Sequence, residues 1–417
     1  LIAIVFTSGC ASDEEKKQTH YKRGMEYFEK GEYKSAVIEF KNAIKIDPKF
    51  AKAYEGLSEA SMKVGDLQTA FRSYGALAEL DPDNLEAQLK LANFFALAKQ
   101  YDEARNKVEL ILSKDPANVD ALILHAGLLV QEKNLFDAVA TYEKVIEIDS
   151  TETRAYLGMA RVLAAQNQLD RAEETLVQAV RLEPDEVSTR LALFEFYNAY
   201  GNHARAEAQL KEAIERNPDN SDLQLILGNY QFTRQNNAAA EAAYQKALEM
   251  DPENMKPYMV TAGFYDAVDR RDEALAMYQQ ALKVQPDDIR IQHAIARQYF
   301  RMQELEQAKQ NMDAVLEKRP NYFPTRLLKA EILTLEKNFD EALTLLGKLI
   351  EEEPDSARSH YFKGLADMGA GNEKLAKAPL AKAVELNPGD IRARLLLAEI
   401  HLRERNFKAA ENQCIEV

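Results

Sequence analysis

A cluster of basic residues is the part of this sequence best suited to bind a ligand. Arg290, His293, Arg297 and Arg301 follow at offsets of three, four and four residues, so a helix would carry all four on one face. Guanidinium groups bind carboxylates and phosphates, often through two parallel hydrogen bonds. Further candidates for the same surface are Arg326, Arg358 and Arg392. The cluster predicts a site for an acidic peptide or a polyanionic saccharide; the alternative is solvated arginines that pair with nearby glutamates.

No other set of residues has the spacing of a catalytic or metal site. The sequence lacks a His-Glu-x-x-His motif, a Gly-x-Ser-x-Gly motif, a Gly-rich phosphate loop and closely spaced cysteine pairs. Its two cysteines, Cys10 and Cys414, are far apart and suggest no disulfide framework. Cys414 falls at an apolar position of the repeat pattern described next, which favours a core thiol. We therefore expect no enzyme activity in these residues, and no cofactor or metal.

The elements that position the basic cluster follow from a repeat of 34 residues. Ten of the 13 prolines lie on one 34-residue grid, and the empty node is Ser150. A proline ends a helix because it lacks the backbone donor and clashes with the preceding turn. The grid prolines are Pro48, Pro82, Pro116, Pro184, Pro218, Pro252, Pro286, Pro320, Pro354 and Pro388.

A second grid, 12 residues upstream, is occupied by alanine at every node from Ala36 to Ala410. A small side chain permits close approach of two helices, and alanine is the best helix former. Four residues after each alanine comes a bulky apolar side chain, such as Phe40, Tyr244 or Leu380, on the same helical stripe. Pro379 alone breaks the pattern inside a helix, where we expect a kink. Fixed self-similarity of this length predicts a continuous array of helix pairs.

This pattern resembles the tetratricopeptide repeat (TPR) family. The family's small residue at position 8 of the repeat appears as Gly24, Ala92 and Gly228, and its turn glycine as Gly31 and Gly65. The resemblance implies an all-α solenoid, a right-handed superhelix of antiparallel helix pairs, over residues 17–417. Eleven full repeats span 17–390, and a truncated twelfth spans 391–417.

The resemblance also implies a concave groove lined by the first helix of each repeat. The groove that grips chaperone C-terminal carboxylates needs Lys, Asn and Asn at fixed positions. Here Asn93 is accompanied by Leu89 and Leu124, so that clamp is absent. The asparagine ladder of glycosyltransferase-linked TPRs is absent too. The basic cluster therefore remains the candidate groove site.

The first residues resemble the end of a bacterial secretory signal. An apolar run over residues 1–6 leads to Ser8, Gly9 and Cys10, similar to the lipobox of bacterial lipoproteins, where the cysteine is lipidated. Ala11 after the cysteine resembles outer-membrane sorting, and residues 11–16 are expected to form a polar tether. A plain cleaved signal peptide or an unmodified buried start is the alternative. The resemblance implies a periplasm-facing protein held at the outer membrane through lipid alone.

Two function classes follow. The first is a non-catalytic scaffold for envelope proteins or peptides, similar to the TPR lipoprotein associated with PEP-CTERM/exosortase systems and exopolysaccharide production. The second is the regulatory arm of an enzyme whose catalytic domain lies beyond Val417. A formal net charge of −15 makes nucleic acid an unfavourable partner for either.

Overall fold

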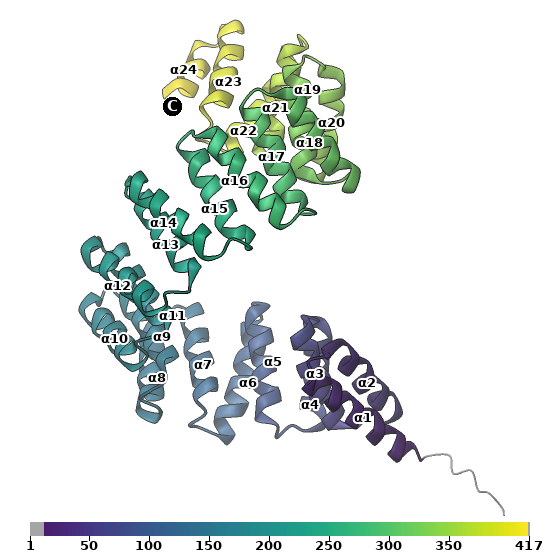
Figure 1. The fold of residues 1–417 in the computed structure, drawn as a ribbon, viewed down its shortest axis with the longest axis vertical. Helices are drawn as coiled ribbons and strands as arrows, with labels where there is room; N and C mark the ends of the chain where they lie inside the picture. The colour runs from purple at the N-terminus through teal and green to yellow at the C-terminus, as the bar shows by residue number, and fades with distance from the viewer. Residues whose placement is uncertain (1–11, 416–417) are drawn as a thin grey trace, which may run out of the picture. The chain divides into compact units, whose positions relative to one another are not determined.

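The structure, a computed structural model, describes residues 12–415. Within that range it holds 24 α-helices and no strand, arranged as antiparallel helix pairs (Figure 1). The helices fall into two compact units, one ending at Arg216 and the other beginning at Asn217. The uniform register of the sequence predicts one continuous array, so this division is a finding of the structure. The all-α class and the paired helices are confirmed; the handedness of a superhelix stays a prediction.

The first unit contains six helix pairs. Its helices are α1 (Asp13–Glu29), α2 (Tyr33–Ile46), α3 (Ala51–Val64), α4 (Leu67–Leu80), α5 (Leu85–Leu97), α6 (Tyr101–Lys114), α7 (Val119–Gln131), α8 (Leu135–Ile148), α9 (Thr153–Ala165), α10 (Leu169–Leu182), α11 (Val187–Ala199) and α12 (His203–Arg216).

The second unit also contains six pairs. Its helices are α13 (Ser221–Thr233), α14 (Asn237–Met250), α15 (Met255–Ala267), α16 (Arg271–Val284), α17 (Ile289–Arg301), α18 (Leu305–Lys318), α19 (Phe323–Leu335), α20 (Phe339–Glu352), α21 (Ala357–Gly369), α22 (Glu373–Leu386), α23 (Ile391–Arg403) and α24 (Phe407–Ile415).

Every turn within a pair is built in the same way. One residue, at position 15 of each repeat, has a left-handed backbone, with φ from 58° to 82°. The residue after it donates its N–H to the carbonyl five residues back, as Asp66 does to Ser61 at 2.9 Å. This bond satisfies a helix-end carbonyl. Four of the twelve left-handed residues are glycines, and eight carry a side chain: Lys99, Lys133, Asn167, Gln235, Asp269, Gln303, Lys337 and Arg405.

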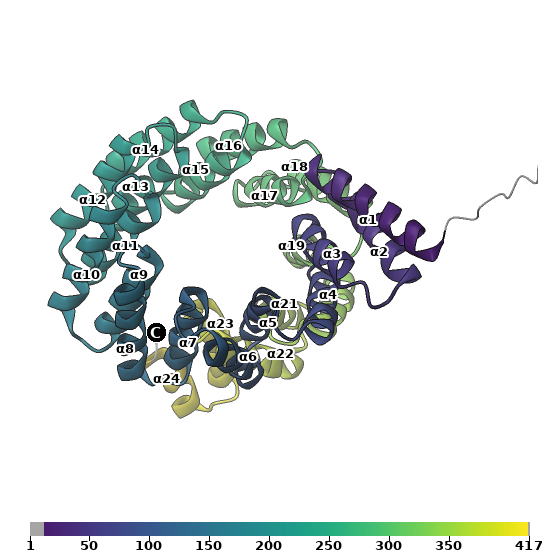
Figure 2. The same ribbon diagram turned by 90° about the horizontal axis from the view of Figure 1, so that it is seen from below.

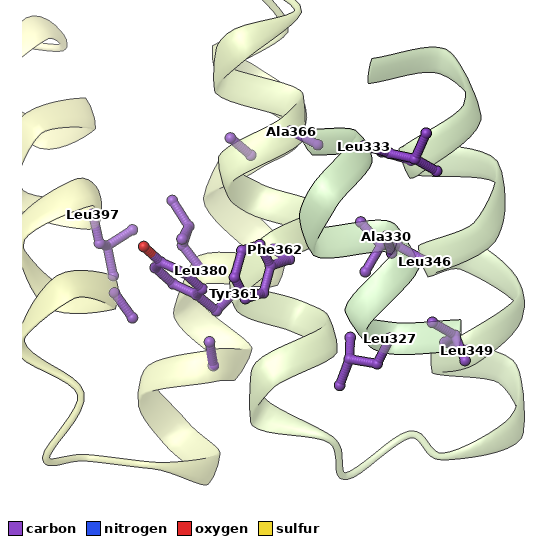
Figure 3. Packing of buried hydrophobic residues seen from close by; sticks show 14 of the residues in the cluster. Leu327, Ala330, Leu333, Leu346, Leu349, Tyr361, Phe362, Ala366, Leu380 and Leu397 are labelled. Carbon is purple, nitrogen blue, oxygen red and sulfur yellow. The ribbon is translucent and has the colours of Figure 1, made fainter. Parts of the chain in front are cut away.

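The core follows the alanine grid and the bulky position four residues after each alanine. Each grid alanine from Ala36 to Ala376 is fully buried. The bulky residue four positions later is also buried and fills the space between helices, as Leu346 and Leu380 do in Figure 3. Where that residue is an aromatic ring, glycine often faces it: a Cβ on Gly24 or on Gly56 would lie within 2.8 Å of the Phe40 ring. The predicted packing role of the alanine grid and of the bulky positions is confirmed.

Exposed ion pairs join successive repeats at a fixed spacing. The last turn of a second helix reaches the residue that follows the proline of the preceding repeat. Lys114 pairs with Asp83 in this way, Arg216 with Asp185 at 2.8 Å, and Lys318 with Asp287 at 3.2 Å. Exposed pairs contribute about 0–1 kcal/mol each, so burial of the core dominates the stability of the stack.

Three local expectations need correction or comment. Asp13 to Lys16 are not a tether but the first turn of α1, because Ser12 and Glu15 form a reciprocal capping box. Cys414 is exposed rather than a core thiol, since within residues 12–415 no later helix pair covers that side of α24. α22 runs unbroken through Pro379. The lipobox-like residues, Cys10 included, lie outside the described range.

Candidate functional site

The odd-numbered helices form the inner face of each unit. Several of them contact the next odd-numbered helix directly, among them α7 with α9, α17 with α19 and α19 with α21. No two even-numbered helices within residues 12–415 make contacts of comparable extent. First helices are therefore packed more closely than second helices, which curves each unit toward them. Figure 2 shows this for α7, α9 and α11 in the first unit and for α13, α15 and α17 in the second.

Three of the predicted arginines are neutralised by a carboxylate of their own helix pair or of the residue that caps it. Arg290 pairs with Asp288, the N-cap residue of its own helix, at 2.5 Å. Arg392 pairs with Asp390 in the equivalent way at 3.4 Å, and Arg326 pairs with Glu352 of α20 at 2.6 Å.

The prediction that Arg290, Arg326 and Arg392 offer free positive charge in the groove is therefore wrong. The physical reason is that an aspartate at a helix N-cap and a glutamate on the partner helix already supply the counter-charge. The alternative interpretation, in which arginines pair with nearby carboxylates, applies to these three.

Two further arginines pair across repeats. Arg301 at the end of α17 forms an ion pair with Asp266 of α15 at 2.8 Å. Arg358 of α21 binds both carboxylate oxygens of Glu331 of α19, with Nη2 to Oε2 at 2.7 Å. The Glu331 side chain is fully buried. A buried carboxylate requires such a partner, because a lone charge in the interior is costly.

His293 is neutral rather than cationic. Its Nδ1 lies 2.9 Å from Oγ1 of Thr325, and its ring packs edge-on to Tyr322. Burial, together with the positive charges of Arg297 and Arg358, lowers the pKa of His293 to about 4. The prediction that this residue adds positive charge to the groove is wrong, since the imidazole remains unprotonated at neutral pH.

Arg297 is the member of the cluster that has no counter-charge of its own. It makes no hydrogen bond or ion pair with any residue in the range 12–415. Burial, and then the charge of Arg358, lower the pKa of the Arg297 guanidinium. Glu331 and Asp266 lie near enough to oppose that shift. Three guanidiniums thus face two carboxylates here, which leaves one positive charge unbalanced.

A second feature, on the first unit, was missed by sequence reasoning. Three adjoining hollows lie among α5, α7, α8, α9, α10 and α11, with volumes of about 470, 220 and 340 Å³. The first and second hollows share Gly127 and Tyr142, and the second and third share Arg161 and Ala165. A Cβ on Gly127 would meet no atom within 4 Å, so this glycine widens the groove. The sequence feature that could have indicated this groove is a set of small side chains on the inner face: Ala160, Ala164, Ala165, Ala192 and Ala199.

Two other kinds of site are absent from the described residues. No group of three or more His, Cys, Asp or Glu side chains in the range 12–415 is arranged to hold a metal ion. None of the described helices combines the length and the apolar character needed to cross a bilayer.

Comparison with protein-family models gives matches along most of the chain. A model described as "Tetratricopeptide repeat" matches residues 61–128, 129–188, 231–297 and 299–366. A second model with the same description matches residues 199–254, and one described as "TPR repeat" matches residues 24–65.

Curated relatives match over short segments. Tetratricopeptide repeat protein 37 of Xenopus laevis is 32% identical over 93 residues, which are 22% of this chain and 6% of that protein. Small glutamine-rich tetratricopeptide repeat-containing protein 2 of Mycosarcoma maydis is 44% identical over 54 residues, 13% of this chain and 15% of that protein. The aligned regions thus span only a small part of these relatives.

Solved structures of similar fold include yeast Tom70, with a TM-score of 0.44 and 19% identity, covering 96% of this chain and 91% of that one. A tetratricopeptide repeat protein from Parabacteroides merdae has a TM-score of 0.49 and 20% identity, covering 56% and 93%. Likeness at this level concerns the fold and carries no statement about ligands.

Proposed function

Since this chain belongs to the tetratricopeptide repeat family, we infer that it is a protein-interaction scaffold, and we propose that it is held at a bacterial envelope membrane by lipid on Cys10. TPR arrays bind other proteins or peptides. The observation that carries the scaffold role is the inner face. There the hollows of the first unit and the unbalanced charge of the second unit offer an apolar and a polar contact surface.

The proposed anchor rests on the sequence Ser8-Gly9-Cys10 and the apolar run before it. A single acyl chain binds a membrane only marginally, whereas several acyl chains on one cysteine would hold the protein stably. Ala11 favours the outer membrane as the destination, with the array in the periplasm. A place in an export or exopolysaccharide assembly system of the PEP-CTERM type is the finer proposal. It is supported by the resemblance of a lipobox followed closely by a long repeat array.

The anchor is tested by metabolic labelling with a fatty-acid analogue in a bacterial host. The chain offers a matched control, because its only other cysteine is Cys414, which is exposed. We expect wild type and Cys414→Ala to be labelled and to sediment with membranes, and Cys10→Ala to do neither. Equal labelling of all three proteins, or loss of the label in Cys414→Ala alone, would overturn the anchor.

The scaffold role is tested separately by crosslinking in the envelope. Wild type should be crosslinked to specific envelope proteins through residues placed on the inner face. The same crosslinker placed on even-numbered helices serves as the control. Crosslinking that is equally strong from both faces would contradict the scaffold proposal.

A further inference from the structure

We propose that Arg297 anchors a carboxylate-binding subsite on the inner face of the second unit, and that it takes an acidic side chain or the C-terminal carboxylate of a partner polypeptide. This inference rests on the scaffold function and names the chemistry that the scaffold recognises. The basic cluster of several residues that the sequence predicts is thereby reduced to a single subsite at Arg297.

Each of the two neighbouring carboxylates already has a partner other than Arg297. Both oxygens of Glu331 accept hydrogen bonds from Arg358. Oδ1 of Asp266 forms an ion pair with Arg301 at 2.8 Å but accepts no hydrogen bond, and Oδ2 accepts a hydrogen bond from the Tyr278 hydroxyl at 3.0 Å. The Arg297 guanidinium therefore retains its donors for a ligand.

The half-buried position of Arg297 makes a ligand carboxylate favourable there. An unpaired cation that is partly removed from water is destabilised, and burial accordingly lowers its pKa. A ligand carboxylate would supply the missing negative charge in surroundings where a charge-assisted hydrogen bond is strong. The two flanking ion pairs are already formed, so little reorganisation is needed when the ligand binds.

Space for a ligand lies on the adjoining helix. Gly263 is three residues from Asp266, on the same face of α15. A Cβ on Gly263 would meet no atom within 4 Å. It is also the residue of α15 that occupies the repeat position of Arg297. The inner face is thus open beside Asp266 and Arg301.

The charges favour a peptide over a polyanionic saccharide. A polyanion gains from several free cations in a row. Arg290, Arg326 and Arg392, which would extend such a row, are each paired with a carboxylate. One unbalanced charge matches one carboxylate.

The test is a peptide array in which each glutamate-containing sequence is printed beside its glutamine counterpart, probed with the full chain. Wild type should prefer the glutamate member of the bound pairs. Arg297→Gln should lose that preference by about 10-fold or more, as expected for a charge-assisted hydrogen bond. Arg290→Gln is the matched control, since Arg290 is already paired, and should keep the preference.

Three results would overturn the subsite: no preference for glutamate in wild type, an unchanged preference in Arg297→Gln, or an equal loss in Arg290→Gln. Binding of a uronic-acid oligosaccharide that depends on Arg297, without a glutamate preference, would replace the peptide by a polyanion.

Thermal melting gives an independent readout. Arg297→Gln should melt no lower than wild type, because it removes an unpaired charge, and a marked drop would assign Arg297 a structural role. The envelope crosslinking experiment does not depend on this residue, so scaffold and subsite can fail separately.

Discussion

The substitution Gly228→Ala tests whether the small residue at position 8 is required by the bulky residue opposite. A Cβ built on Gly228 in α13 would lie 2.3 Å from Cε1 and 2.5 Å from Cδ1 of Tyr244 in α14. The Tyr244 ring has little freedom to move away. It is 1% exposed, it packs against Phe264, and its hydroxyl donates to Oδ1 of Asn229 at 2.8 Å.

The expected magnitude is a difference between two effects. Overpacking of a filled core costs about 1–3 kcal/mol. Replacing glycine by alanine within a helix contributes about 1 kcal/mol in the opposite direction. Gly263→Ala in α15 is the matched control, because it brings the same helix gain and its Cβ meets no atom within 4 Å. Gly263→Ala should therefore stabilise the protein, and Gly228→Ala should be less stable than this control by roughly 1–3 kcal/mol.

Urea unfolding followed by circular dichroism gives the two free energies. Hydrogen exchange in α13 and α14 shows whether the loss is local, as expected where each repeat contacts only its neighbours. In the Gly228→Ala background, Tyr244→Leu should cost less than it costs in wild type, because the smaller side chain relieves the clash. Equal shifts for the two alanine variants, or a Tyr244→Leu cost that is the same in both backgrounds, would refute the reasoning.

Three further predictions concern single residues. Ala206→Leu, at a fully buried grid position, should destabilise its helix pair by about 1–3 kcal/mol, and an unchanged melting curve would contradict this. The pKa of His293, about 4, lies below its ordinary value of 6.5, so acidification from pH 6.5 to 4 protonates the unfolded chain first. Stability should then fall by at most about 3 kcal/mol more in wild type than in His293→Gln, with the pKa itself read by NMR. Pro379→Ala should raise the melting temperature, because it restores a helix hydrogen bond and removes the clash of the ring with the preceding turn, together worth up to about 3 kcal/mol. A lower melting temperature would show that the ring is needed for packing.

The fold could be predicted from the sequence because every repeat packs in the same way. Ala36 and its equivalents, and Phe40 and its equivalents, have the same neighbours in every pair, so the pattern carries the structure. The division after Arg216 could not be predicted, since the grids run through it unchanged. The exposure of Cys414 has a related reason: its repeat position predicts burial, but no helix pair follows α24 within residues 12–415.

The candidate site was predicted less well, because helical spacing shows which residues share a face but not what lies opposite them. Arg301 pairs with Asp266, 35 residues away, and Arg358 pairs with Glu331, 27 residues away; both carboxylates belong to neighbouring repeats. An alignment of the repeats offers part of this signal, since Glu331 occupies the position of Arg297 one repeat later. The depressed pKa of His293 depends on burial among several helices, for which no sequence motif exists.

The uniform turn within each helix pair has a consequence for how such a chain can evolve. Because five polar residue types, at eight positions, adopt the same left-handed conformation that glycine adopts at the other four, the turn does not require glycine. Duplication or loss of a 34-residue segment that begins and ends at this turn would therefore join a first helix to a second helix through the same geometry. Such an event would leave the remaining pairs in register and would change chiefly the length of the inner face and the order of its side chains. Gene-level gain and loss of repeats can thus alter which partners this protein binds without requiring a new fold.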